Sequence, residues 1–250
     1  PVGAAVWWAR GAPPLPVEGI ALGLGSGVLE AAYFILLAGA YRRGDLSVVY
    51  PLARGTAPLL LVGVGIVILG ERLGLAGWVG VALLLAGFLA VQRPWRTLHG
   101  RGGGRRPDTA VAFAIATGVM IAGYTALDRV GTRLIEPITY AAILWSSGTI
   151  LLVLWVRLVT GGGLASGGRG EVGRSAVGGI VALAAYLLIL GALSVAPLTA
   201  VAPLRESATV VAATWGSIRL GEAIDRRDTV RRVVASAIIV AGAILLALDG

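Results

Sequence analysis

Four ionisable side chains lie inside apolar stretches of this sequence, and they are its best candidates for chemistry. Glu30 and Arg54 lie in the first half, and Arg205 and Glu206 lie next to each other in the second. Ionisable groups are costly in hydrocarbon, so they face a cavity, a substrate or an opposite charge. Glu30 is predicted to line a cavity, where it would take up a proton or contact a cation. A packing role, paired with Arg54, is the alternative.

A proline lies close to each arginine of this set. Pro51 precedes Arg54 by three residues, and Pro203 precedes Arg205 by two and Glu206 by three. Because proline removes a backbone hydrogen bond and exposes a carbonyl group, we predict a polar helix break in each half. Arg205 and Glu206 are about 100° apart on a helix, so they cannot both face one point. Contact between substrate and either arginine would favour an anionic or zwitterionic substrate.

Four tyrosines are further candidates for the lining of a cavity: Tyr33, Tyr50, Tyr124 and Tyr186. An aromatic ring with a hydroxyl group suits an amphiphilic small molecule. Tyr33 shares a helix face with Glu30, which lies three residues earlier. Anchoring at the membrane interface is the alternative role for these tyrosines, and it is the prediction for most of the tryptophans.

Other residues in the apolar stretches are expected to be structural. Asp128 and Arg129 are predicted to lie near a helix end, at the membrane interface. A glycine–glutamate pair ends one helix in each half and is expected to fix the short loop that follows. These pairs are Gly70 with Glu71 and Gly221 with Glu222. Three glycines spaced four residues apart predict close helix packing in lipid: Gly19, Gly23 and Gly27.

The composition is that of a membrane protein. The 250 residues are 57% hydrophobic and 14% charged, whereas soluble domains carry about 25% charged residues. The absence of cysteine excludes a disulfide framework, and with a single histidine no metal or other cofactor is predicted. The net charge of +8 comes from arginines clustered between apolar stretches, which argues against nucleic-acid binding. No Walker motif or nucleophile–base pair stands out, so neither an ATP-driven pump nor an enzyme is predicted.

The apolar stretches predict an all-α integral membrane protein. A span needs about 20 mostly apolar residues, and eight stretches qualify once the uncharged run 175–204 is split at its prolines. The segment before residue 19 is typical of the end of another helix followed by a proline-rich loop, so we expect the N-terminal end to be missing. The predicted spans are 19–41, 46–69, 73–91, 109–127, 137–156, 175–194, 199–218 and 233–248.

The two halves of the sequence share motifs in the same order. Ala-Ala-Tyr occurs at 31–33 and 184–186, and Leu-Gly-Glu occurs at 69–71 and 220–222. Recurrence over a long period indicates a repeated unit, and an odd number of helices per unit would place the two units in opposite orientations. Inverted repeats are typical of secondary transporters, which bind substrate at the repeat interface. We predict an incomplete first repeat at 1–91, a basic Gly-rich linker at 92–108 and a second repeat at 109–250.

A family resemblance rests on two segments. Residues 51–91 and 202–248 each contain a proline in one helix, a Gly-Glu pair at the end of that helix and an Ala-Gly pair in the closing helix. In this pattern the chain resembles the EamA-type repeat of the drug/metabolite transporter superfamily. The resemblance implies a ten-helix transporter of two inverted five-helix repeats that works by alternating access, with the first two helices absent from this chain.

These features predict a secondary transporter that exports small organic metabolites, or amino-acid-like or drug-like compounds, across a bacterial inner membrane. The expected partners are a small-molecule substrate and the lipid bilayer, with protons as a candidate coupling ion through Glu30 or Glu206. A homodimer is left open. The alternative functions are a lipid flippase, a membrane scaffold that does not transport, and an intramembrane enzyme.

The distribution of arginine predicts the orientation in the membrane. Arginines concentrate in the loops around 42–43, 93–106, 157–174 and 219–232 and are sparse in the loops on the opposite side. The positive-inside rule places the arginine-rich loops in the cytoplasm and the C-terminus outside. The family resemblance implies a cytoplasmic C-terminus instead, so both orientations are carried forward.

Overall fold

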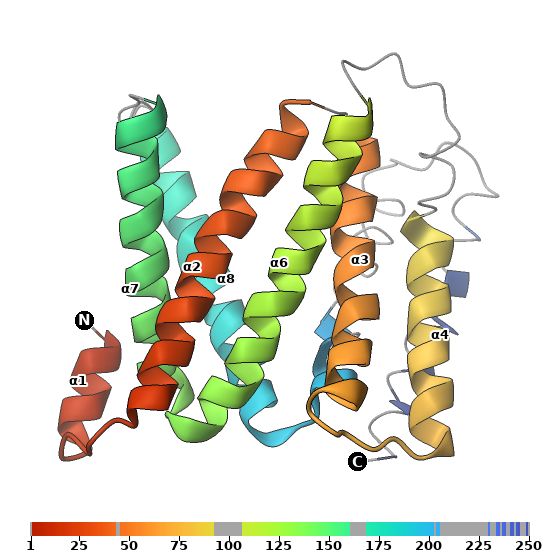
Figure 1. Cartoon of the computed structure of the whole chain (residues 1–250), viewed down its shortest axis with the longest axis horizontal. Coiled ribbons are helices and arrows are strands. Elements are labelled where there is room, and N and C mark those ends of the chain that lie inside the picture. The colour runs from red at the N-terminus through yellow and green to blue at the C-terminus, as the bar shows by residue number, and fades with distance from the viewer. Residues whose placement is uncertain are drawn as a thin grey trace. The chain divides into compact units, whose positions relative to one another are not determined.

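The computed structural model describes residues 2–43, 46–92, 107–160, 169–202 and 204–205, together with single residues and pairs between 230 and 249. Within this described part of the chain, the regular secondary structure is helical and includes no strand. The elements are α1 (Val2–Ala9), α2 (Val17–Tyr41), α3 (Leu46–Val67), α4 (Leu75–Gln92), α6 (Pro107–Leu134), α7 (Pro137–Trp155), a π-helical segment η1 (Val156–Thr160) and α8 (Arg169–Val195) (Figure 1).

Four of the helices are long and apolar enough to cross a membrane. A helix of about 20 residues spans the hydrocarbon core of a bilayer, so the chain is a membrane protein with several apolar helices. The predicted count of eight spans and the inverted repeat stay predictions, because residues 206–229 and much of the C-terminal span lie outside the described residues. The four segments are Val17–Tyr41, Thr109–Leu134, Pro137–Val159 and Val172–Val195.

The predicted end of the fourth span, at residue 127, is wrong, and the error affects Asp128 and Arg129. The span predicted at 109–127 continues to the end of α6, so Asp128 and Arg129 lie inside the helix. Both are buried, with 0% and 6% of their surface exposed, and neither is at an exposed interface. The two charges have hydrogen-bond partners within the fold, and the helix ends only before Pro137, where proline disfavours helical backbone in the preceding residue.

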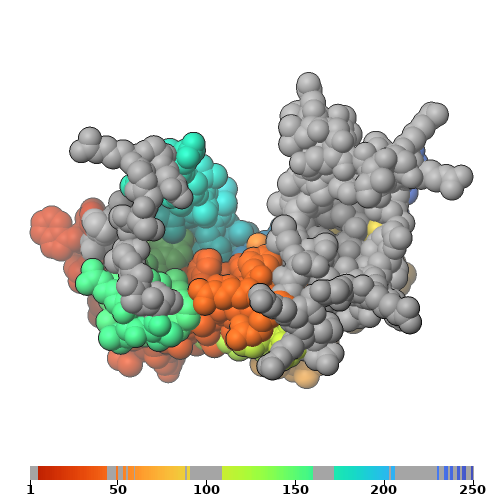
Figure 2. Space-filling model, turned by 90° about the horizontal axis from the view of Figure 1, so that it is seen from above, coloured from red at the N-terminus to blue at the C-terminus, as the bar shows by residue number. Residues whose placement is uncertain are grey.

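The outward faces of α7 and α8 are apolar. Ile150 and Leu154 on α7, and Ile180 and Leu188 on α8, are 48% to 77% exposed, and α7 forms part of the surface in the space-filling view (Figure 2). Large exposed apolar faces are unfavourable in water and mark contact with a membrane or another protein. These faces therefore agree with helices that contact lipid.

The chain forms two compact units, and each contains segments from both halves of the sequence. The first unit comprises Pro1–Ile35 and Gly123–Val195, and the second comprises Leu36–Ala122 and Ala196–Gly250. The predicted boundaries of the two repeats concern sequence similarity, which packing does not test, so they stay predictions. The two units are described separately below.

The core of the first unit lies where α7 packs against α1 and α8. Tyr140, Leu144 and Leu190 are buried at its centre. Gly23 on α2 lies against Tyr140 and Ile143, and a β-carbon at Gly27 would overlap the carbonyl oxygen of Leu144. The predicted close packing of the glycine-spaced face is confirmed, because only glycine lets the two backbones approach so closely.

The second unit has a core of small side chains. Ala40, Val49 and Ala53 pack with Ala110 and Ala114 of α6. Small residues bring helix backbones together in lipid, where helices associate through van der Waals contact rather than through expulsion of water. This unit holds the two arginines that the sequence places inside apolar stretches.

Candidate functional site

Asp128 accepts hydrogen bonds from three hydroxyl groups on three other helices. Ser26 Oγ on α2 and Tyr140 Oη on α7 donate to Asp128 Oδ1 at 2.5 Å and 3.1 Å, and Tyr186 Oη on α8 donates to Oδ2 at 2.5 Å. All four residues belong to the first compact unit. We call these four residues the Asp128 cluster. A carboxylate removed from water needs such donors to offset the loss of its hydration.

Aromatic rings extend the Asp128 cluster along the helices. The ring of Tyr124, one turn before Asp128 on α6, lies 6.1 Å from the ring of Tyr33 and 6.3 Å from that of Tyr186. Trp145 on α7 lies 6.2 Å from Tyr186. Rings at these separations and tilts are in the favourable range for aromatic pairs. The first unit therefore holds a row of four aromatic rings beside a buried carboxylate.

Glu30 lies one helical turn after Ser26 on α2 and is half-buried. Residues four apart share a helix face, so Glu30 projects from the side of α2 that reaches Asp128. One of its carboxylate oxygens lies 3.7 Å from the place that a β-carbon would occupy at Gly148 of α7. A second acidic group thus lies in the same unit as the Asp128 cluster.

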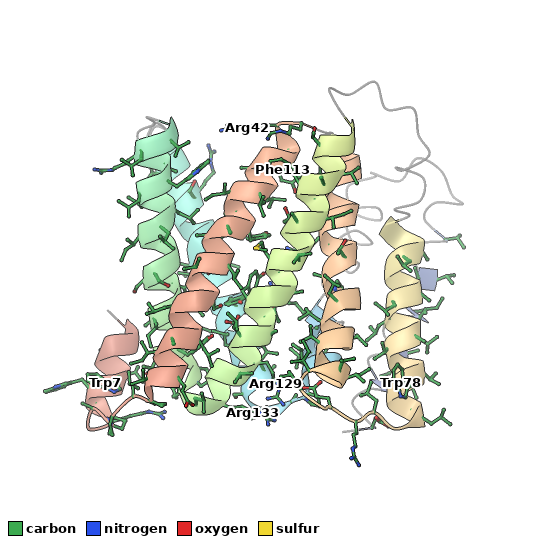
Figure 3. All side chains as sticks on the ribbon, in the orientation of Figure 1. Trp7, Arg42, Trp78, Phe113, Arg129 and Arg133 are labelled. Atoms are coloured by element: carbon green, nitrogen blue, oxygen red, sulfur yellow. The ribbon has the colours of Figure 1, made fainter. Side chains whose placement is uncertain are left out.

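Arg129 is the buried cation next to Asp128 in the sequence. Its Nη1 donates to the carbonyl oxygen of Leu193 on α8 at 2.7 Å. Arg133, one turn further on, lies near the same end of α6 and is exposed (Figure 3). The two arginines therefore have different environments, although they are only four residues apart.

Three of the four predicted tyrosines come together in the first unit, namely Tyr33, Tyr124 and Tyr186, and Glu30 lies on the same helix as Tyr33. Arg54 and Arg205 are half-buried members of the second unit, so a joint site of arginines and tyrosines stays a prediction. The side chains of Tyr50 and Pro51 lie outside the described part of α3. The other candidates outside the described residues are Pro203, Glu206, Gly221 and Glu222.

The first glycine–glutamate pair lies in the loop that follows α3. Gly70 has a φ of +65°, a left-handed conformation that glycine adopts without strain. The Glu71 carboxylate accepts hydrogen bonds from the backbone N–H groups of Leu198 and Thr199 at 2.6 Å and 2.8 Å. These groups begin a new helical turn after Pro197, and the first N–H groups of a helix have no partner within the helix. The structural role predicted for this pair is consistent with these contacts.

Reasoning from the sequence missed Asp128, Ser26 and Tyr140 as site residues. Asp128 follows Tyr124 by four residues and therefore shares its helix face, but the predicted span ended one residue before it. Ser26 lies within the glycine-spaced stretch, where packing alone was predicted. A predicted helix that continued to the residues just before Pro137 would have included Asp128 among the candidate site residues.

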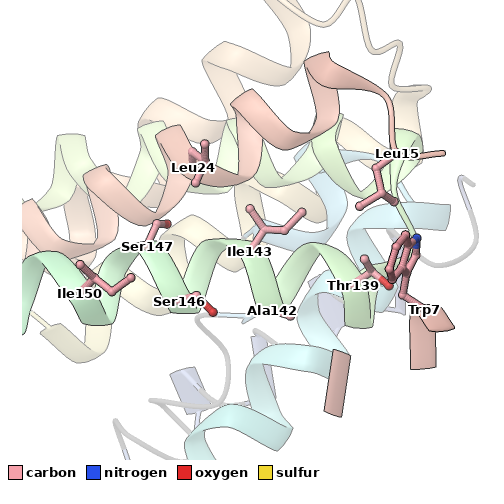
Figure 4. Close-up of a pocket in the computed structure, with 9 residues that line it drawn as sticks. All are labelled: Trp7, Leu15, Leu24, Thr139, Ala142, Ile143, Ser146, Ser147 and Ile150. Carbon is pink, nitrogen blue, oxygen red and sulfur yellow. The ribbon is translucent and has the colours of Figure 1, made fainter. Parts of the chain in front are cut away.

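A separate groove of about 440 Å³ lies between α1, α2 and α7 (Figure 4). Its lining is mostly apolar, and none of its residues is a hydrogen-bond partner of Asp128. No group of three or more His, Cys, Asp or Glu side chains that could hold a metal ion occurs in the part of the chain that the structure describes. The groove is lined by Trp7, Leu15, Leu24, Thr139, Ala142, Ile143, Ser146, Ser147 and Ile150.

Comparison with known proteins identifies the family. Residues 108–248, more than half of the chain, match the EamA-like transporter family. The chain belongs to this family. The assignment agrees with the predicted resemblance and places this EamA-like chain among transporters rather than enzymes; it does not favour the alternatives of a flippase or a scaffold.

Curated relatives carry the name spermidine export protein MdtI. The relative from Shigella flexneri is 41% identical over 61 residues, which are 24% of this chain and 56% of the relative. That from Shigella dysenteriae is 39% identical over 70 residues, or 28% of this chain and 64% of the relative. The matches therefore span little more than half of these relatives. A protein of known crystal structure has a similar fold, with a TM-score of 0.72 and 20% identity over the whole chain and 84% of that protein.

Proposed function

We propose that this EamA-like chain is a secondary exporter of small organic cations, with the Asp128 cluster as its substrate site. The single observation that carries the proposal is a buried carboxylate whose three hydroxyl donors come from three different helices, beside a row of aromatic rings. Such a carboxylate offers a charge partner to an ammonium group, and the rings offer faces for cation–π contact. Burial strengthens both interactions, because little water screens the charges.

The donors around Asp128 suit reversible binding. In the folded chain the hydroxyls of Ser26, Tyr140 and Tyr186 satisfy the carboxylate oxygens. Each hydroxyl group can rotate and can accept as well as donate a hydrogen bond, so the same groups can turn toward an ammonium group. The substrate would therefore exchange one set of hydrogen bonds for another instead of leaving a bare charge.

Proton coupling follows from the same carboxyl group. Asp128 cannot hold a proton and balance the charge of an ammonium ion at the same time, so uptake of a proton from one side would release the cation. Among the described residues, Tyr140 on α7 and Tyr186 on α8 are ionisable groups in contact with Asp128. Arg129 is adjacent to it, and Glu30 projects from the face of α2 that carries Ser26. This proposal replaces Glu30 or Glu206 with Asp128 as the first candidate for coupling.

The relatives support a cationic substrate. Spermidine, named in the curated relatives, carries several ammonium groups, and those proteins export it. An amino-acid-like zwitterion is the second substrate class, because its ammonium group would fit the Asp128 cluster. Alternating access across a bacterial inner membrane and assembly as a homodimer belong to the same proposal.

The experiment is uptake of radiolabelled putrescine, spermidine and leucine into inverted membrane vesicles with an imposed pH gradient. We expect amine uptake by the unsubstituted chain and a fall to about one tenth or less in Asp128→Asn, because a buried charge pair is lost. Asp128→Glu should retain part of the flux. Glu18→Gln is the matched control, since Glu18 is an exposed acid in the first turn of α2.

Two results would overturn the proposed function. One is amine uptake in Asp128→Asn that equals uptake by the unsubstituted chain. The other is transport of leucine with no transport of either amine, together with insensitivity to the Asp128 substitution. Scrambling of a fluorescent lipid by the same vesicles, without amine flux, would favour the flippase alternative.

A further inference from the structure

The guanidinium group of Arg129 contacts a backbone carbonyl that the helix itself cannot satisfy. In an α-helix the carbonyl of Leu193 would accept from the N–H group of residue 197, but residue 197 is a proline and has no N–H group. α8 ends at Val195, and within a membrane an unsatisfied carbonyl is costly. Arg129 Nη1 supplies the missing donor, in a hydrogen bond of 2.7 Å to the Leu193 carbonyl oxygen.

Two hydrogen bonds described above join α6 to α8. Tyr186 donates to Asp128, and Leu193 accepts from Arg129. Positions 186 and 193 are seven residues apart, close to two full turns, so they lie on one face of α8. Asp128 and Arg129 are consecutive on α6. Asp128 and Arg129 therefore bind one face of α8 at two positions, Tyr186 and Leu193, which are about 10 Å apart along the helix axis.

We propose that Arg129 is a positioning residue that holds the end of α8 in place and thereby keeps the Tyr186 hydroxyl on Asp128. The inference deepens the proposed function and rests on it for its kinetic consequence. This positioning role also gives a reason for the burial of a cation next to the carboxylate. The guanidinium group of arginine stays charged, and its five N–H donors have a fixed planar arrangement. Arg129 would act through Tyr186, without contacting the transported cation itself.

The geometry of α6 and α8 can be tested without a transport assay. Because the chain contains no cysteine, spin labels can be attached through cysteines placed at Val130 and Leu188, which are 37% and 77% exposed on α6 and α8. We expect Arg129→Gln to shift or broaden the distance distribution between the labels, and Arg129→Lys, which still donates to a carbonyl, to restore most of it. Arg133→Gln is the matched control, an exposed arginine on the same helix.

A double-mutant cycle tests whether Arg129 acts through Tyr186. Arg129→Gln and Tyr186→Phe should each raise KM for the amine about tenfold, the size of one lost hydrogen bond, with little change in kcat. If Arg129 acts through Tyr186, the double variant should resemble the single variants, because the second change removes nothing further. A purely structural loss would lower the amount of folded protein without this coupling.

The inference and the proposed function fail in different ways. An unchanged label distance in Arg129→Gln, or KM increases that multiply in the double variant, overturns the positioning role. Normal amine transport by Asp128→Asn overturns the substrate site, whereas the label distances still decide whether Arg129 holds α8. A changed label distance in Arg129→Gln, together with KM increases that do not multiply in the double variant, supports both the positioning role and the substrate site.

Discussion

At the scale of single residues, the proposed site depends on how the buried carboxylate of Asp128 is hydrogen-bonded. Asp128 is fully buried, yet it is not isolated, because both of its oxygens accept hydrogen bonds. An unsatisfied buried polar group costs about 1 to 3 kcal/mol, and more for a charge. Each hydroxyl of the Asp128 cluster therefore contributes to folding as well as to the proposed substrate site, and removing one should affect both.

Ser26→Ala tests this dual role. The substitution removes one of two hydroxyl donors to Oδ1 of Asp128 and keeps that of Tyr140, so we expect KM for the amine to rise several-fold and the free energy of unfolding to fall by about 1 kcal/mol. Initial rates of uptake and thermal unfolding in detergent measure the two effects. Ser146→Ala, an exposed hydroxyl on α7, should change neither; an unaltered KM in Ser26→Ala would contradict a role for this hydroxyl.

At the scale of helices, glycine spacing determines how closely α2 approaches α7. A β-carbon at Gly27 would overlap the side chain of Ser147 and the carbonyl of Leu144, whereas at Gly25 the nearest atom, Leu127 Cδ1, lies at 3.5 Å, an ordinary contact. The two glycines are two residues apart on one helix, so they differ in packing and not in helix position. They form a matched pair for experiment.

Gly27→Ala should lower the melting temperature and Gly25→Ala should not. The first change forces the α2 and α7 backbones apart, and overpacking costs about 1 to 3 kcal/mol. Because Ser26 and Glu30 lie on the same helix, the displacement should also reduce amine uptake. Equal melting temperatures for the two variants would show that the close approach of α2 and α7 is not needed for stability.

At the scale of the whole molecule, the position of Arg129 sharpens the orientation predicted from arginine. Arg129 is buried and bonded within the fold, so it does not belong with the loop arginines. The side of the predicted topology that is poor in arginine then retains Arg10, Arg72 and Arg133, all exposed. The asymmetry between the two sides is therefore greater than the sequence alone suggests.

A C-terminal alkaline phosphatase fusion tests this orientation. The enzyme is active only outside the cytoplasm, and the positive-inside rule places the C-terminus there, so we expect activity. A fusion to a fluorescent protein that matures only in the cytoplasm is the complementary control and should stay dark. Fluorescence without phosphatase activity would instead support the cytoplasmic C-terminus implied by the family resemblance.

The sequence by itself determined the features that depend on neighbouring residues. Most of α2, α3, α4 and α7 lie where runs of about 20 apolar residues predict them, and the glycine-spaced face of α2 follows from a spacing of four. The family was identified from motifs within two continuous segments. Tyr33, Tyr124 and Tyr186 were chosen because each is a polar aromatic residue in an apolar run. Each of these features can be recognised within one continuous stretch of sequence, without knowledge of which stretches contact each other.

Only the tertiary structure decided which polar groups come together in the proposed site. Ser26 lies 102 residues from Asp128 in the sequence and Tyr186 lies 58 residues from it, so no local pattern pairs them. The cost of burying a charge depends on the partners that surround it, and these partners come from α2, α7 and α8. From the sequence, Asp128 and Arg129 are therefore predicted to lie at the end of a helix. In the folded chain they lie within α6, buried and hydrogen-bonded.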